Sequence, residues 1–156
     1  MAKELMEIGG FITEGAEIVN HDASLSGNGT VDSPLGLNET VLWELPTIGG
    51  TSTSATLSED FTNFEQIEVW WSQQSTRTTV QRYYTKNLEQ LFCVHGKYQA
   101  SNGFIYLFIA AWSISGTSAT KLYCKYKSSD QWNNNNWTDA NELCPCKIIG
   151  INRKAQ

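Results

Sequence analysis

The chain has 156 residues, a formal net charge of −5 and a sequence pI near 5.0. This length is typical of one domain with room for a substantial core and a short extension. No basic run is longer than the "NRK" near the C-terminus, and this disfavours a nucleic-acid partner because binding to phosphates requires clustered Lys and Arg.

Residues 1–45 predict an extended N-terminal arm. The segment is Gly-rich, poor in aromatic residues before Trp43, and interrupted by Asn28-Gly29 and Pro34. Such a segment cannot bury enough surface to fold alone, so we expect it to lie against something else. It contains no apolar stretch of signal-peptide length, and we expect a soluble protein that is not exported by an N-terminal signal.

The next part of the chain has the pattern of β-strands. Apolar residues at every second position, Ile67, Val69 and Trp71, predict a strand with one face toward a core. Residues 77–85 continue in β-branched and aromatic residues, and residues 89–95 give another short apolar segment.

The segment Phe104–Ile114, "FIYLFIAAWSI", is apolar on both faces. This pattern predicts a central strand, or a strand covered on one side by its own sheet pair and on the other by a neighbouring subunit. The following "ATKLYCKYK" alternates, which predicts that Leu122, Cys124 and Tyr126 point inward.

The last predicted strand is Leu143–Ile151, "LCPCKIIGI". Pro145 near its start favours an edge position or a bulge, because proline cannot donate to a strand ladder. No long segment with a helical period follows residue 61, and turns recur between short strands. We therefore predict an all-β fold: a jelly-roll-like β-sandwich head over residues 46–156, preceded by the arm of residues 1–45.

The four cysteines, Cys93, Cys124, Cys144 and Cys146, are expected to be reduced and partly buried. In an extended strand, the two cysteines of "CPC" are two positions apart, and this backbone geometry disfavours a disulfide between them. The other cysteines and both histidines are scattered singly, without the spacing of a metal site. We expect no metal and no cofactor, and a structural role for His95.

The stretch "SLSGNGTVDSPLGL" at residues 24–37, the segment "LSEDFTNFEQIEVWWS" and the closing "CKIIGI" together resemble tail-fibre or receptor-binding proteins of tailed bacteriophages. The resemblance covers roughly residues 25–151. It implies a β-rich head, and an arm that lies in a threefold bundle where three chains cover one another, hence a homotrimer. It also implies that the protein is part of the virion and is synthesised in the host cytoplasm.

The segment Ser128–Glu142, "SSDQWNNNNWTDANE", predicts a long loop with a candidate ligand site. Trp132 and Trp137 flank four asparagines, including Asn134 and Asn136, and exposed indoles beside amides suit a sugar. The alternative is that both tryptophans anchor the loop and the asparagines adopt turn conformations.

Trp70 and Tyr83 are weaker candidates for the same surface, since aromatic residues on strands are more often core or subunit contacts. Carboxylate pairs, which glycoside hydrolysis requires, occur at Glu59-Asp60, Glu65/Glu68 and Asp139/Glu142. None of these pairs lies in a recognisable motif, and we assign no catalytic residue.

The expected function is therefore that of a non-catalytic virion protein. It would attach to a host-surface carbohydrate or outer-membrane component through the head, and to other virion proteins through the arm. The alternative is a structural decoration, collar or head-fibre protein that contacts only other virion proteins.

Overall fold

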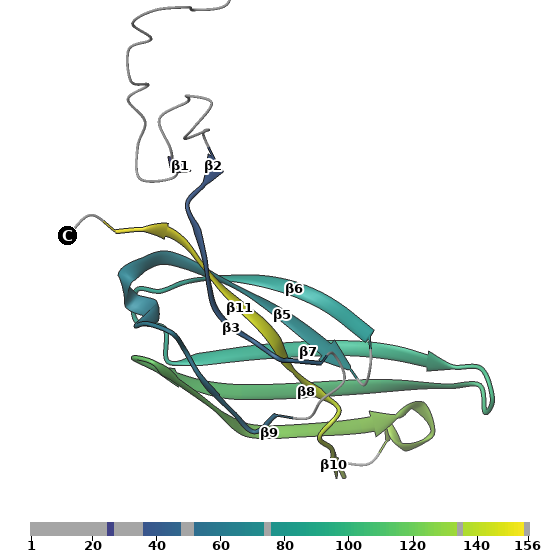
Figure 1. Cartoon of the computed structure of the whole chain (residues 1–156). Coiled ribbons are helices and arrows are strands. Elements are labelled where there is room, and N and C mark those ends of the chain that lie inside the picture. The colour runs from purple at the N-terminus through teal and green to yellow at the C-terminus, as the bar shows by residue number, and fades with distance from the viewer. Residues whose placement is uncertain (1–24, 27–35, 48–51, 74–75, 134–135, 155–156) are drawn as a thin grey trace, which may run out of the picture.

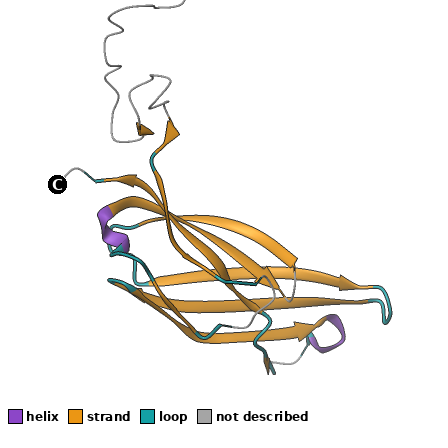
Figure 2. Cartoon of the chain, in the orientation of Figure 1, coloured by secondary structure: helices purple, strands orange, loops and turns teal. Residues whose placement is uncertain are grey.

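The computed structural model describes residues 25–26, 36–47, 52–73, 76–133 and 136–154 (Figure 1). Within these residues the chain is built almost entirely of β-strands, as predicted, with two short 3₁₀ turns, η1 (Phe61–Asn63) and η2 (Ser129–Gln131) (Figure 2). The strands are β1 (Leu25–Ser26), β2 (Gly36–Leu37), β3 (Glu39–Glu44), β4 (Ser54–Thr56), β5 (Phe64–Gln73), β6 (Thr76–Tyr84), β7 (Gln90–Gln99), β8 (Phe104–Ser115), β9 (Ser118–Ser128), β10 (Thr138–Asp139) and β11 (Leu143–Arg153).

Two antiparallel sheets form a sandwich-like head. Sheet I has the order β3-β11-β5-β6, and sheet II has the order β10-β9-β8-β7 with β4 also paired to β9. In the short pair β1 and β2, Leu25 is opposite Leu37. The predicted all-β fold is confirmed.

The core lies between the inner faces of the two sheets. Ile67, Val69 and Trp71 of β5 are fully buried, as their alternation predicted, and Leu91 and Trp112 face them from sheet II with no exposed surface. Each such side chain contributes about 1.5–3 kcal/mol when it leaves water, so this double layer supplies the main stabilisation of the head.

β3 belongs to the head and not to the arm. Its residues pair with β11, with Trp43 opposite Ile148, and Leu42 is only 2% exposed. The predicted boundary after Leu45 therefore differs from the structure, in which the sandwich begins at Glu39. Sequence composition could not reveal this pairing, because β3 and β11 lie at opposite ends of the chain.

β11 is a central strand, between β3 and β5. The sequence predicted either a bulge at Pro145 or an edge position for this strand. The register shifts between Pro145 and Lys147, so the bulge is present, whereas the strand is not at an edge. At Gly150 the Phe64 ring of the neighbouring strand β5 packs closely on the β11 backbone: a Cβ atom there would lie 2.6 Å from Cγ of Phe64.

A bulge also corrects one predicted side-chain direction. The register of β8 and β9 shifts between Ala111 and Trp112, whose partners are Tyr123 and Lys121. Leu122 is the extra residue and is 49% exposed, whereas Cys124 is buried as predicted. The prediction that Leu122 points inward is wrong, because an inserted residue breaks the two-residue alternation.

Candidate functional site

Sheet II reaches beyond sheet I, and its uncovered inner face forms a cleft. The hairpin of β7 and β8 extends past the ends of β5 and β6 (Figure 1). A cavity of about 390 Å³ opens there, and we call it the aromatic cleft. Its lining residues are Lys97, Gln99, Tyr106, Phe108, Tyr126 and Glu142.

Strand register brings the three aromatic rings of the cleft together. Phe108 on β8 is directly opposite Tyr126 on β9, and Tyr106 is two residues before Phe108 on the same face. The rings of Phe108 and Tyr126 stack with centroids 5.6 Å apart, and those of Tyr106 and Tyr126 are tilted at 6.0 Å. Such a contiguous aromatic floor can contact the apolar face of a planar or ring-shaped ligand.

Polar groups surround this floor. Lys97 is directly opposite Tyr106 on the neighbouring strand, and Gln99 and Glu142 also line the cavity. The hydroxyl of Tyr106 accepts a hydrogen bond from Nδ2 of Asn102 at 2.9 Å, and Oδ1 of Asn102 accepts from the N–H of Phe104 at 3.0 Å. The ring of Tyr106 is thus held by the β7–β8 turn, and the cleft combines an ammonium, an amide and a carboxylate with apolar rings.

His95 lies beside the cleft on β7, opposite Phe108. Partial burial and the nearby positive charge of Lys97 hold the pKa of His95 below its usual value. The imidazole is therefore neutral at physiological pH.

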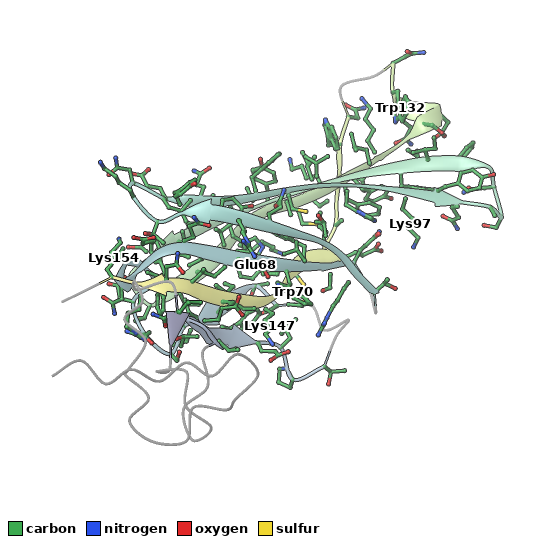
Figure 3. All side chains as sticks on the ribbon, turned by 90° about the horizontal axis from the view of Figure 1, so that it is seen from above. Glu68, Trp70, Lys97, Trp132, Lys147 and Lys154 are labelled. Atoms are coloured by element: carbon green, nitrogen blue, oxygen red, sulfur yellow. The ribbon has the colours of Figure 1, made fainter. Side chains whose placement is uncertain are left out.

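Trp132 and Trp137 lie on the other side of sheet II from the cleft. Figure 3 shows Lys97 and Trp132 on opposite sides of the β7–β8 ribbon. The two tryptophans converge on Lys127: its Nζ donates to the carbonyl oxygen of Trp132 at 3.4 Å and lies 5.8 Å from the centre of the Trp137 ring. Trp132 is 53% exposed.

The predicted loop contains two short elements, η2 and β10. Lys127 contacts the backbone of Trp132 and the ring of Trp137, while the Trp132 and Asn136 side chains are exposed. Asn134 lies outside the described residues.

Trp70 lies on the outer face of sheet I (Figure 3). Both its indole N–H and its ring are in contact with neighbouring side chains. Its Nε1 donates to Glu68 at 2.7 Å, and the guanidinium carbon of Arg77 lies 4.6 Å from the ring centre. Glu68 also accepts from Arg82 at 2.7 Å. Burial alone would raise the pKa of Glu68, but the hydrogen bonds from Arg82 and Trp70 outweigh it and the pKa lies below its usual value.

Tyr83 links the two sheets. Its hydroxyl donates to the carbonyl oxygen of Phe92 at 2.7 Å and accepts from the N–H of Phe92 at 3.2 Å. Burial raises the pKa of this hydroxyl. The structure thus places Trp70, Tyr83 and the Trp132–Trp137 pair in three separate environments and does not bring them to one surface.

The predicted carboxylate pairs are divided among different contacts. Glu59 forms a two-pronged ion pair with Arg153, at 2.5 and 2.6 Å, whereas the neighbouring Asp60 accepts from the N–H of Thr62 at the start of η1. Asp139 lies 4.0 Å from Lys125 on sheet II, and Glu142 lines the cleft.

All four cysteines are free thiols and buried, as expected from the sequence. Burial raises the pKa of Cys93 to about 12. The described part of the chain contains no cluster of three or more His, Cys, Asp or Glu side chains placed to hold a metal ion. None of its helices has the length and hydrophobicity needed to cross a bilayer.

The cleft residues were missed by sequence reasoning because their pattern is that of ordinary strands. Tyr106 and Phe108 were part of an apolar run, and Tyr126 was assigned to the core. The only available signal was the polar Lys97 and Gln99 at alternate positions near the end of a strand. Comparison with known proteins adds no further identification: no family model and no curated protein matches the chain.

Proposed function

We propose that the protein is a non-catalytic tail-fibre or receptor-binding protein of a tailed bacteriophage, and that the aromatic cleft binds a carbohydrate of the host surface. The sequence resemblance supports the virion assignment. The observation that carries the ligand class is the cleft itself, where three contiguous aromatic rings adjoin Lys97, Gln99 and Glu142.

The chemistry of the cleft suits a sugar. One face of a pyranose ring is apolar and can stack on the Tyr126 ring, while its hydroxyl groups both donate and accept hydrogen bonds. Lys97 can donate, Glu142 can accept, and the Gln99 amide can do both. A cavity of about 390 Å³ is in the size range of small-molecule sites and suits one or two sugar units.

Attachment by such a site would depend on several copies acting together. A shallow cleft of this kind is expected to bind one glycan weakly, in the millimolar range of about 4 kcal/mol. On a homotrimer, three identical clefts facing a repetitive cell surface gain avidity from their high effective concentration. We propose that the arm joins this head to other virion proteins.

The experiment that tests this proposal compares two pairs of substitutions. Tyr106→Ala and Tyr126→Leu remove the aromatic floor, and the leucine keeps apolar volume against the core. Trp132→Ala combined with Trp137→Ala removes the predicted loop site. Binding is measured on an array of purified bacterial surface polysaccharides and by saturation-transfer NMR with the fragments that bind.

The cleft variants should weaken binding at least tenfold, about 1.4 kcal/mol, while their circular dichroism spectra stay native. The tryptophan variant should retain wild-type affinity. The proposal for the cleft is refuted by the reverse pattern, in which the tryptophan variant alone loses binding. Release of reducing sugar from a bound polysaccharide would contradict the non-catalytic assignment.

One observation favours the second candidate, a structural decoration, collar or head-fibre protein. The outer face of sheet II exposes large apolar side chains, including Val94 and Tyr98, and such a surface suits contact with protein rather than with sugar. Wild-type protein that binds no polysaccharide and does not compete with phage adsorption would support this candidate.

A further inference from the structure

The outer face of sheet II carries a contiguous apolar surface, which we call the apolar face. It consists of side chains that point away from the core on the three long strands β7, β8 and β9. They are Phe92, Val94 and Tyr98 on β7, Ile105, Leu107 and Ile109 on β8, and Tyr123 on β9. Tyr98 is 65% exposed, Val94 46% and Ile105 44%.

Strand register places these exposed apolar residues next to one another on the sheet. Val94 is directly opposite Ile109, and Tyr98 is opposite Ile105. Single exposed apolar residues are normal on a protein surface, but a contiguous patch marks a contact site.

The outer face of sheet I is different and provides an internal comparison. There, Glu68 pairs with Arg82 at 2.7 Å and Lys147 pairs with Glu44 at 3.2 Å. This sheet therefore carries charges across its outer face, as expected of a surface in water. On sheet II the charges are confined to the β9 side, where Lys125 lies 4.0 Å from Asp139.

The dimensions of the apolar face suit a protein partner. The strands β7, β8 and β9 have 10, 12 and 11 residues. With a rise of about 3.3 Å per residue and a strand spacing of about 4.8 Å, they span about 35 Å by 14 Å, roughly 500 Å² in projection. The accessible area of a surface corrugated by side chains is larger, which brings it near the roughly 800 Å² that each partner contributes to a specific interface.

We infer that the apolar face is covered by another copy of this chain. Interfaces between identical subunits are more apolar than those between partners that exchange, and charges are depleted from their centres. Three copies that turn this face toward a common threefold axis bury the β7 and β8 side chains in the middle and leave Lys125 and Asp139 at the rim.

This assignment specifies the contact within the assembly proposed above and rests on that assembly, but it does not depend on glycan binding. The cleft is on the inner face of sheet II and the apolar face is on the outer face. Association through the apolar face therefore leaves the cleft accessible in every copy.

The test compares charged substitutions on the two outer faces. Val94→Lys with Ile105→Lys introduces two charges on the apolar face. The matched control, Val80→Lys with Tyr84→Lys, changes residues that are 47% and 74% exposed on sheet I. Mass is measured by light scattering and sedimentation from about 1 to 100 µM.

The wild type and the control should have a multiple of the 17.5 kDa chain mass, and the Val94/Ile105 variant should be monomeric. A monomeric wild type, or an unchanged mass of the variant, would overturn the inference. Hydroxyl-radical footprinting gives a measurement on unmodified protein. Tyr98 should be protected relative to Tyr84, and equal oxidation of the two would also overturn the inference.

The same variant separates this inference from the proposed function. If both hold, the monomeric variant keeps the single-site affinity for a polysaccharide fragment and loses avidity for cells. If the cleft variants lose glycan binding while their mass is unchanged, the defect lies in the cleft and not in the assembly.

Discussion

Substitution of Gly150 by alanine tests how closely the Phe64 ring of β5 packs on the backbone of β11 within sheet I. The added Cβ would lie 2.6 Å from Cγ of Phe64 and 2.7 Å from each Cδ atom. Carbon atoms in contact are ordinarily about 3.5–4.0 Å apart, so the ring or the strand must move by about 1 Å.

Neither neighbour can move freely. Phe64 has no exposed surface, and the guanidinium carbon of Arg153 lies 4.6 Å from its ring centre. Gly150 is opposite Ile67 in β5 and Thr40 in β3, so its strand is held on both sides. Overpacking costs about 1–3 kcal/mol, and with both sides fixed we expect the upper end, about 3 kcal/mol, or a melting temperature lower by about 6–12 °C.

The free energy of unfolding is measured by urea titration with tryptophan fluorescence. Gly96→Ala is the matched control on β7, because a Cβ there meets no atom within 4 Å, and it should be neutral or stabilising by less than about 1 kcal/mol. Phe64→Leu should cost less in the Gly150→Ala background than in wild type, because the two positions are coupled. A Gly150→Ala protein within about 0.5 kcal/mol of wild type would refute this reasoning.

Three further predictions concern pH, thiols and the arm. Hydrogen bonds from Arg153 hold the pKa of Glu59 below its usual value. The ion pair therefore stabilises the fold at neutral pH, and this stabilisation is lost as pH falls through the folded pKa. In urea titrations, the stability difference between wild type and Glu59→Gln should shrink from about pH 6 to about pH 3. Ellman's reagent at about pH 8 should label no thiol in the native protein and all four cysteines in denaturant, whereas fast native labelling would contradict their burial. A chain that begins at Glu39 should unfold at the same urea concentration as the full chain, and one that begins at Thr47 should be destabilised by several kcal/mol because it lacks Leu42, which is 2% exposed.

The part of the fold that could be predicted from sequence is the part that local alternation determines. Ile67, Val69 and Trp71 are all fully buried, because a two-residue period assigns faces without knowledge of the partner strand. Leu122 was assigned to the wrong face because its bulge depends on the register with β8. The place of β11 in the middle of sheet I also depends on partners, and a bulge at Pro145 removes the local reason to expect an edge.

The candidate site depends on relationships that no local pattern contains. Phe108 and Tyr126 are 18 positions apart and meet because their strands pair in one register. The cleft that they line depends on the continuation of sheet II past sheet I, and so on the relative lengths and offsets of strands in two layers (Figure 1). The paired Trp132 and Trp137 were conspicuous in sequence, but only the structure shows that both contact Lys127.

The run Phe104–Ile114 is apolar on both faces for two different reasons. These reasons connect the proposed ligand cleft with the proposed subunit contact. Toward the core, Phe108 and Trp112 are buried, and the same face continues into the cleft at Tyr106. On the other side, Ile105, Leu107 and Ile109 meet no other element of the described chain that would bury them fully. One strand thus contributes to the proposed ligand site with its inner face and to the proposed subunit contact with its outer face. Because alternate residues serve the two faces, substitutions at Tyr106 and at Ile105 can separate binding from assembly although the two residues are adjacent in the chain.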